Sequence, residues 1–492
     1  MMNRINQPSS LPTLAGVTLA FAAILISLCP MPARADIASD TSALRKIYED
    51  KRPSLVAVKY TWESELGSQE LVAAGVILSE DGLVMIPIAM VTPQMVPASQ
   101  IKSFKIVVPS DTQDETEVDA TLVSRDERGN LALVRANTPQ KWKPITFVDK
   151  SVEVGELVYS VGLLPRGAGY KAHVTRAFVS AKLRGPVPQV LCEGDLASVG
   201  APVFNESGEA IGYVHPRALT EALLDNPENP DDMPMVTNPP KLFIPSTDFV
   251  ASLKDLSTVD KQEPIPWLGS LELKGLDKEF AEFFDLKNTP AVQVGDVVKD
   301  SPADKAGLKT LDVIVKFNGQ PIERGDMPVE LPQILTRKIQ RLKPGDQITL
   351  GVIHQKGDAP KEITVTLGER PKQPQDARRF YAKDLGFVTR EVVFVDTYRR
   401  HLPSNAPGVV IVLLRPSAAA QAAKLHVNDM VTQMNGQPVQ NLDQFKKDYQ
   451  QFRKEKPHDP VVLEVTQLDG KQQTINIEPP QTAVAPGGDM QP

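Results

Sequence analysis

An internal repeat in its second half constrains the fold of this 492-residue chain more than any other feature. Residues 312–322 (DVIVKFNGQPI) recur as residues 429–439 (DMVTQMNGQPV). Both copies contain an Asn-Gly pair, and these residues accept the positive φ angles of a tight reverse turn. Two copies are too few for a stacked solenoid, so the repeat predicts two separate domains of one fold.

The segments that follow the two copies share a second pattern. Apolar residues at helical spacing predict an amphipathic helix, and the alternation after it predicts a β-hairpin over residues 348–367 and again over 461–477. The second helix is preceded by Asn441, with Gln444 at capping-box spacing. The predicted apolar faces are Leu331, Ile334, Leu335, Ile339 and Leu342 in the first helix, and Leu442, Phe445, Tyr449 and Phe452 in the second.

The first half of the chain, residues 55–256, contains short runs of β-branched residues separated by turns. Many short strands with regular turns predict a sandwich or a barrel. A Pro- and Asp-rich stretch, residues 226–240, interrupts this pattern and is predicted to be a surface loop. The predicted strands lie at residues 71–78, 83–86, 104–108, 120–123, 131–134, 157–161 and 242–244.

Length and charge narrow the class of protein. A chain of 492 residues with 41% hydrophobic content predicts two to four globular domains. Its 43 prolines and 30 glycines suit β-rich modules with many turns. A net charge of -7 excludes nucleic acid as an expected partner, and it argues against anionic membrane surfaces.

The N-terminus has the pattern of a secretory signal peptide spanning residues 1–35. Arg4 precedes an apolar run over residues 14–28, and Ala33-Arg34-Ala35 forms an A-x-A cleavage site. An uncleaved anchor is the alternative, although the run is short for a membrane span. A lipoprotein signal is disfavoured because Leu28 precedes Cys29. We therefore expect a periplasmic or secreted protein without stable membrane insertion after cleavage.

Cleavage would remove two arginines and no acid, which changes the formal charge from -7 to -9. It would leave Cys192 as the single cysteine, so no internal disulfide is expected. A lone cysteine in an oxidising compartment is either a reactive thiol or a small buried hydrophobe, and the second interpretation is favoured.

The order of these segments resembles the HtrA (DegP-like) family. Residues 75–82 resemble the glycine-turn strand pair before the family's catalytic histidine, residues 126–134 its aspartate segment, and residues 199–212 its serine segment. The repeat resembles its two PDZ domains. The resemblance implies a mainly β chain: a trypsin-like double β-barrel followed by two PDZ domains, which are α+β, partly open barrels with helices.

The positions that the resemblance assigns to the catalytic triad carry other residues. The family's histidine falls on Ala89, its aspartate on Asn130 and its serine on Val199. Ala89 has no lone pair to accept a proton, and Val199 has no oxygen to attack an amide. Ala197 also replaces a glycine that helps to form the family's oxyanion site.

Three other readings keep an active enzyme. Ser198 is one residue out of register, and Cys192 as nucleophile would need a neighbouring histidine. The histidines of this half are His173 and His215, neither at the base position. The third reading is a misaligned triad, and the alignment would then have to be wrong at three places independently.

No histidine or cysteine pair has metal-ligand spacing, and no glycine loop suits a phosphate, so no metal or cofactor is expected.

The resemblance to PDZ domains implies capture of the C-terminal end of an extended peptide, added as a strand at a sheet edge. The carboxylate-binding loops fall on residues 267–270 and 385–387, and helix residues line the pocket for the last apolar side chain. The same helix face also suits an ordinary core. The implied peptide-binding residues are Trp267, Leu268, Gly269, Ser270, Leu335 and Ile339 in the first domain, and Leu385, Gly386, Phe387, Phe445 and Tyr449 in the second.

These expectations divide the chain into a signal peptide (1–35), a trypsin-like (pseudo)protease domain (36–258), PDZ domains at 262–371 and 377–480, and a disordered tail (481–492). The leading hypothesis is an exported pseudoprotease that binds unfolded or C-terminal peptide segments as a chaperone, scaffold or regulator. The alternatives are an active serine endopeptidase and a structural protein whose PDZ copies mediate assembly. The resemblance implies a homotrimer, or a hetero-oligomer with an active relative.

Overall fold

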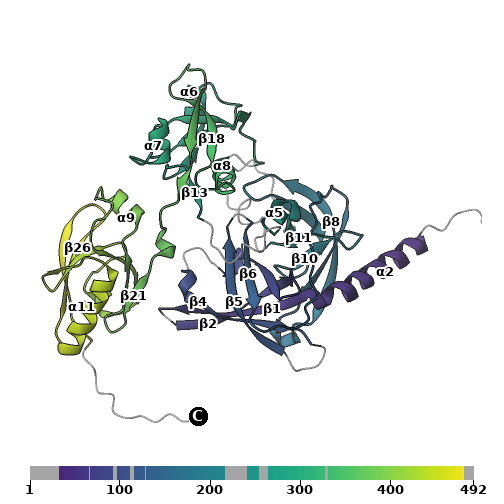
Figure 1. Ribbon diagram of the computed structural model, residues 1–492, viewed down its shortest axis with the longest axis horizontal. Helices are drawn as coiled ribbons and strands as arrows, with labels where there is room; N and C mark the ends of the chain where they lie inside the picture. Colours follow the sequence, from purple (N-terminus) through teal and green to yellow (C-terminus); the bar gives the residue numbers. More distant parts are fainter. Residues whose placement is uncertain are drawn as a thin grey trace, which may run out of the picture.

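The computed structural model describes residues 33–65, 67–91, 97–110, 116–127, 129–215, 241–253, 264–326 and 331–480. Figure 1 shows three bodies along the chain: a pair of barrels and two smaller repeat domains. Most of the predicted signal peptide, the predicted loop at 226–240 and the predicted tail lie outside the described residues. In the described part, no helix has both the length and the apolar character needed to cross a bilayer.

The first barrel closes in the order β1-β2-β3-β6-β5-β4. Alternate side chains of its strands fill the interior, where Val58, Val84 and Ile106 are fully buried. Each strand predicted in this region is present. Their bounds are β1 (Leu55–Ser64), β2 (Gly67–Ile77), β3 (Leu83–Pro87), β4 (Ile101–Val108), β5 (Thr116–Asp126) and β6 (Leu131–Ala136).

The second barrel closes in the order β10-β11-β12-β9-β8-β7. Helix α2 (Ala33–Lys51) precedes the first barrel, and its Tyr48 hydroxyl donates to the Ala172 carbonyl of β8 at 3.4 Å. The mainly β double barrel predicted from the sequence is therefore confirmed. The strands are β7 (Leu157–Leu163), β8 (Ala172–Leu183), β9 (Gln189–Gly194), β10 (Pro202–Phe204), β11 (Ala210–Val214) and β12 (Lys241–Pro245).

The first repeat domain (residues 264–370) is a sheet in the order β14-β15-β16-β18-β19. Helix α8 covers this sheet with the apolar face predicted from the sequence, and Leu335 and Ile339 are buried. The strands are β13 (Pro266–Trp267), β14 (Leu273–Gly275), β15 (Val292–Val294), β16 (Val313–Phe317), β17 (Gln320–Pro321), β18 (Gln347–Ile353), β19 (Lys361–Thr366) and β20 (Gly368–Glu369), and the helices are α6 (Lys278–Phe283), α7 (Pro302–Ala306) and α8 (Leu331–Gln340).

The second repeat domain (residues 377–480) has the same arrangement, and its main sheet has one more strand than that of the first domain, in the order β21-β22-β23-β24-β26-β27. Helix α11 buries Leu442, Phe445 and Tyr449, as its sequence pattern predicts. The strands are β21 (Arg379–Ala382), β22 (Phe387–Glu391), β23 (Val409–Leu414), β24 (Met430–Met434), β25 (Gln437–Pro438), β26 (Val461–Thr466) and β27 (Gln472–Ile477), and the helices are α9 (Phe394–Arg399), α10 (Ala419–Ala422) and α11 (Leu442–Glu455).

Candidate functional site

The three positions predicted to replace a catalytic triad belong to segments that meet between the two barrels. Ala89 lies in the short helix α3 (Ile88–Val91), directly after β3. The Ile88 amide donates to the carbonyl of Asn130 at 3.1 Å, which joins the first two segments. Gly200, next to Val199, packs so tightly that an added Cβ would lie 3.1 Å from the Pro87 ring. The fold therefore brings the three segments together.

A cavity of about 330 Å³ is lined by residues of two of these segments, Met90 next to Ala89 and Val199 itself. Val199 and Met90 line it from opposite barrels, whereas Ala89 is exposed and lies outside the lining. Most of the lining is aliphatic, so the cavity suits an apolar side chain better than a charged one. The lining residues are Ala57, Val72, Ala73, Ala74, Met90, Leu163, Leu164, Pro165, Arg166, Tyr170, Ser198 and Val199.

Ser198 is the hydroxyl nearest to the predicted nucleophile position. Its Oγ accepts the Leu163 amide at 3.1 Å, which ties the side chain to the end of β7. A Cβ added at Gly162 would lie 2.6 Å from the same oxygen, so the hydroxyl packs directly on that strand. No imidazole lies within hydrogen-bonding distance of this oxygen in the part of the chain that the structure describes.

The other candidate nucleophile, Cys192, and the two candidate bases, His173 and His215, lie on different strands or strand ends of the second barrel. Cys192 lies on β9 with no exposed surface, and burial raises the pKa of its thiol to about 12. His173, on β8, pairs with Gly162 of β7, and burial lowers the pKa of its imidazole. The backbone amide of His215, just after β11, donates to the Leu242 carbonyl. A protonated thiol inside a barrel wall is a poor nucleophile.

The loop at residues 267–270 of the first repeat domain lies between β13 and β14. Gly269 has a φ of 103°, and its carbonyl accepts both the Val298 amide and the Ser301 hydroxyl, at 3.0 and 3.1 Å. In the described residues, the amides of Leu268 and Gly269 donate to no backbone carbonyl. Adjacent unpaired amides in such a loop form a nest that suits a carboxylate.

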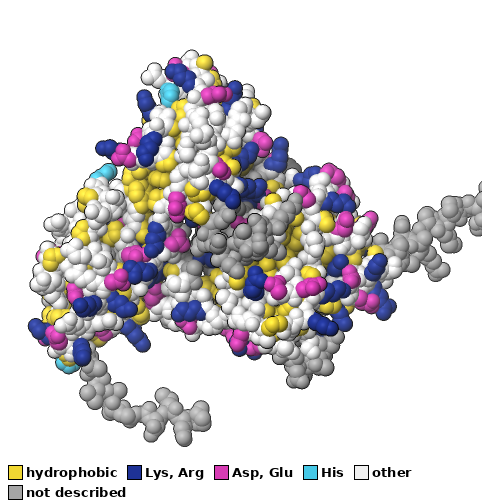
Figure 2. Space-filling model, viewed as in Figure 1, with side chains coloured by type: hydrophobic (Ala, Val, Ile, Leu, Met, Phe, Trp, Pro, Cys, Tyr) yellow, Lys and Arg dark blue, Asp and Glu magenta, His cyan; other side chains and the backbone are white. Residues whose placement is uncertain are grey.

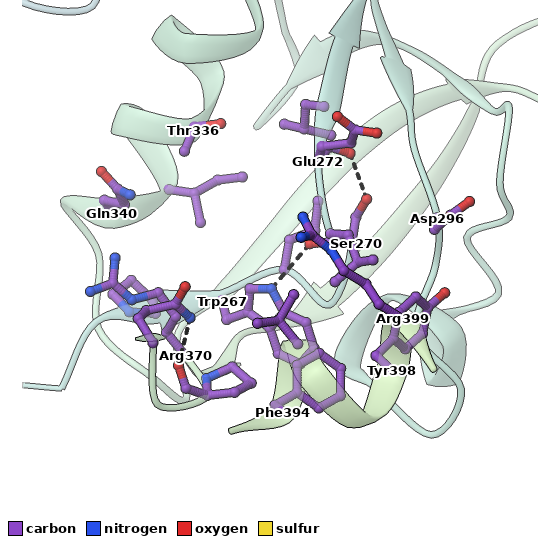
Figure 3. A pocket seen from close by; sticks show the side chains of 18 of the residues that line it. Trp267, Ser270, Glu272, Asp296, Thr336, Gln340, Arg370, Phe394, Tyr398 and Arg399 are labelled. Carbon is purple, nitrogen blue, oxygen red and sulfur yellow. Dashed lines mark hydrogen bonds between the residues drawn. The ribbon is translucent and has the colours of Figure 1, made fainter. Parts of the chain in front are cut away.

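A pocket of about 710 Å³ adjoins this loop (Figure 3). Trp267, Leu268, Ser270 and Ile339 line it, as the sequence predicts for peptide-binding residues. Leu335 is 1% exposed and belongs to the hydrophobic core, so of the two predicted helix residues only Ile339 reaches the pocket.

Part of this pocket consists of residues that carry no local sequence signal. Phe394, Tyr398 and Arg399 reach it from α9 of the second repeat domain. Figure 2 shows hydrophobic side chains gathered where β13 and α9 approach each other. No short-range signal marks these residues, because they lie more than a hundred residues from the loop that they face.

In the second repeat domain, the predicted peptide-binding residues contact the domain's own chain. Strand β21 pairs antiparallel with β22, from Ala382 opposite Phe387 to Arg379 opposite Arg390. The Phe380 ring of β21 lies 6.1 Å from Phe445 and 5.6 Å from Tyr449, measured between ring centroids.

The loop at residues 385–387 is also paired within the second repeat domain. Leu385 and Phe387 are fully buried, and the Gly386 amide donates to the Ala382 carbonyl at 2.8 Å. The Tyr449 hydroxyl donates to Asp384 at 2.6 Å. One amide of the predicted carboxylate-binding loop is therefore already satisfied by the protein itself.

Comparison with known families agrees with this architecture. Residues 73–212 match the trypsin-like peptidase domain, and residues 274–367 and 387–478 each match the PDZ domain. These matches show a trypsin-like domain model followed by two PDZ domain models along the chain.

The relatives and one solved structure narrow this class. The chain is 28% identical over 358 residues to a probable periplasmic serine endoprotease DegP-like of Hahella chejuensis (68% of this chain, 67% of the relative), and 29% identical over 350 residues to one of Rhizobium meliloti (68% and 63%). The match thus spans about two thirds of the relatives' length. The fold is similar to that of a serine-to-alanine variant of the HtrA-type protease AlgW, solved with a decapeptide: TM-score 0.50, 17% identity, 67% of this chain and 98% of that chain. The relatives show what the sequence is similar to, and the solved structure shows a likeness of fold.

Proposed function

We propose that this protein is an HtrA-like pseudoprotease that binds unfolded or C-terminal peptide segments through its first repeat domain, as a chaperone, scaffold or regulator. The assignment as a pseudoprotease depends on a single observation, the composition of the inter-barrel cleft. Peptide hydrolysis needs a nucleophile and an adjacent base. Val199 lines this cleft at the position of the nucleophile, and Ala89, next to the lining residue Met90, stands at the position of the base; both supply only hydrocarbon.

The nearest alternatives do not restore the missing groups. The Ser198 oxygen accepts the Leu163 amide and has no imidazole in reach among the described residues. Replacement of a glycine by Ala197 further disfavours an oxyanion site, because glycine reaches the required backbone angles more freely. A cleft that keeps its fold while its polar groups become aliphatic supports binding rather than hydrolysis.

The peptide-binding part of the proposal is supported by the first repeat domain. Its PDZ match, its unpaired loop amides and the adjoining pocket together suit an extended peptide with a free carboxylate. The relatives are probable periplasmic endoproteases by name, which supports a periplasmic location for this chain. We extend the proposal to a homotrimer or a hetero-oligomer with an active relative, in which this chain would present peptide to its partner.

An active serine endopeptidase is the competing function, and the names of the relatives favour it. Incubating the purified full chain with unfolded casein, beside an active DegP-like relative as positive control, separates the two. We expect no cleavage and no labelling by a serine-reactive phosphonate. Cleavage that disappears in the Ser198→Ala variant would overturn the pseudoprotease assignment and make Ser198 the nucleophile.

The cysteine alternative has its own test. Because burial raises the pKa of Cys192 to about 12, the thiol stays protonated at pH 8. Iodoacetamide is therefore expected to modify the unfolded chain but not the folded one, as measured by mass spectrometry. Rapid labelling of the folded protein would show a reactive thiolate and reopen the question of a cysteine nucleophile.

Peptide binding is tested by titrating the full chain with a fluorescein-labelled decapeptide that ends in Val-Ala-Leu. Binding that is lost when the same peptide is amidated would support carboxylate capture by the first repeat domain. Equal binding of the amidated peptide would contradict it.

A further inference from the structure

The pocket beside the loop at residues 267–270 is shared by both repeat domains. Loop residues and Ile339 of α8 line it from the first domain. Phe394, Tyr398 and Arg399 of α9 line it from the second (Figure 3). We infer that α9 of the second repeat domain completes the peptide site of the first, and that Arg399 pairs with the free carboxylate of the bound peptide. This inference rests on the proposed peptide-binding function.

Helix α9 is held firmly in its own domain. The Arg390 guanidinium donates to both oxygens of Asp396, at 2.5 and 2.8 Å, and the two side chains are almost fully buried. The Val393 amide donates to the same carboxylate at 2.9 Å, which fixes the first turn of the helix. A bidentate pair of this kind limits the orientations open to α9.

Ring contacts join α9 to the loop of the first repeat domain. Phe394 meets the Trp267 indole edge to face, with ring centroids 5.8 Å apart. The indole is itself fixed, because its Nε1 donates to the Ser270 carbonyl at 3.1 Å. The aromatic contact therefore acts on a side chain of the carboxylate-binding loop.

The charges around the pocket single out Arg399. Arg370 pairs with Glu127 at 3.2 Å, and Glu272 pairs with Lys274 at 3.0 Å. Arg399 has no ion-pair partner among the described residues, and Figure 3 shows its side chain directed toward Ser270. Asp296 also lines the pocket and, within the described residues, forms no ion pair with Arg399.

This arrangement defines the occupant as the last residues of a peptide with a free carboxylate and an apolar terminal side chain. A volume of about 710 Å³ accommodates a few residues. The loop amides and Arg399 face the carboxylate, while Ile339 and Leu273 offer apolar surface to the last side chain. The second repeat domain then acts as a wall of the first site.

The test is a double-mutant cycle between Arg399 and the peptide carboxylate, measured by fluorescence anisotropy on the full chain. The fluorescein-labelled decapeptide ending in Val-Ala-Leu is used in free and amidated forms. Arg399→Gln is expected to weaken the free peptide on the order of tenfold and to leave the amidated peptide unchanged. Lys447→Gln, an exposed change of the same charge on α11, is the matched control and is expected to leave both affinities unchanged.

A second variant tests the aromatic contact. Phe394→Ala is expected to weaken the free peptide several-fold, with the fold of the variant checked by thermal unfolding. Unchanged affinity in both variants would overturn the shared site, and tighter binding would show instead that α9 blocks the groove. Failure of the wild-type chain to bind, or equal binding of the amidated peptide, would overturn the proposed function itself before any variant is compared.

Discussion

The two repeat domains share a fold but differ at one sheet edge. In the first repeat domain, the outer edge of β14 has no strand partner among the described residues, and a pocket adjoins it. In the second, β21 pairs with the equivalent edge of β22. A peptide added by strand augmentation would need the position that β21 occupies. The same fold therefore presents one open groove and one that is filled by its own chain.

The difference comes from the segment that leads into each domain. In the first, the leading strand β13 pairs with β20 at the far end of the domain, which leaves the groove clear. In the second, β21 continues directly through the loop into β22 as a hairpin. Phe380 then packs its ring against Phe445 and Tyr449 of α11, where a ligand side chain would lie. The leading strand pairs with β20 in the first domain and with β22 in the second, and this difference decides which groove is open to a peptide.

The largest expected effect comes from the glycines of the two loops. An alanine at Gly269 would adopt a φ of 103° and place its Cβ 2.4 Å from the Ser301 hydroxyl, so Gly269→Ala distorts the open loop. We expect peptide affinity to fall by roughly a hundredfold in anisotropy titrations. Gly386→Ala, whose Cβ would lie 2.3 Å from that of Ala418, is expected to destabilise the second domain and to leave affinity within about threefold. The reverse result would place the peptide in the second groove.

The second-largest expected effect concerns the ion pairs that attach the first repeat domain to the barrels. Asp248, with 1% of its side chain exposed, accepts from Arg337 at 2.6 Å and from Arg341, both on α8 or directly after it. Asp248→Asn removes the buried negative charge that both guanidinium groups contact, and we expect a loss of about 2–4 kcal/mol in denaturant unfolding.

The matched control for this change is on the second repeat domain. Asp443 pairs with Arg378, but its side chain is 70% exposed, so Asp443→Asn is expected to cost about 0–1 kcal/mol. Hydrogen exchange on Asp248→Asn should rise in α8 first. Equal effects of the two substitutions would show that the first domain is not anchored through Asp248.

Truncation of Phe380, whose ring fills the groove of the second repeat domain, tests what keeps this groove closed. Phe380→Ala removes a half-buried ring from between Phe445 and Tyr449, and we expect the second domain to lose about 2–3 kcal/mol in thermal unfolding. Calorimetry is expected to show one bound peptide per chain as before, because the backbone of β21 still pairs with β22. A second binding site in this variant would mean that the ring alone closes the groove. Phe283→Ala on α6, where the ring is exposed, is the control with little expected effect.

The fold followed from patterns that are local in the sequence. Short strands and turns predicted a sandwich or a barrel, the family resemblance implied the double barrel, and helical spacing predicted α8 and α11. The Asn441 side chain accepts the Gln444 amide at 3.0 Å, as the capping-box spacing predicts, although Gln444 reaches back to Gln440 instead. Asn-Gly turns lie where expected, with positive φ at Asn318 and Asn435.

The site could be predicted only in part. The loop at residues 267–270 was found from its resemblance, and Trp267, Leu268, Ser270 and Ile339 do line one pocket. Two features had no local signal: β21 is four residues long, and α9 faces a different domain. Lys424 differs from these two features, because its alignment with Gly307 of the first copy marks it in the sequence, and it adopts a left-handed φ of 64°. Short pairings and contacts between domains depend on distant residues that no periodicity reports.

The smallest expected difference concerns the aspartate that begins each repeat. Asp312 uses both oxygens, one for the Lys309 amide at 2.7 Å and one for the His354 ring at 2.6 Å. Asp429 uses one oxygen, for the His426 amide at 2.8 Å. An asparagine keeps a single side-chain oxygen, so Asp312→Asn is expected to cost about 1 kcal/mol, whereas Asp429→Asn keeps its main bond.

Asp429 also carries a pH signature. Burial raises the pKa of its carboxyl, against the opposing charges of His426 and Arg400, so the folded domain holds this proton more tightly than the unfolded chain does. Stability contributed by this group therefore falls as pH rises from the unfolded pKa, near 3.9, through the folded one. We expect Asp429→Asn to remove that slope and to gain less than about 1 kcal/mol at pH 7 in urea unfolding between pH 4 and 7. An unchanged slope would show that Asp429 is not the source of the pH dependence. A loss of stability equal to that of Asp312→Asn would show that the two aspartates stabilise their domains equally.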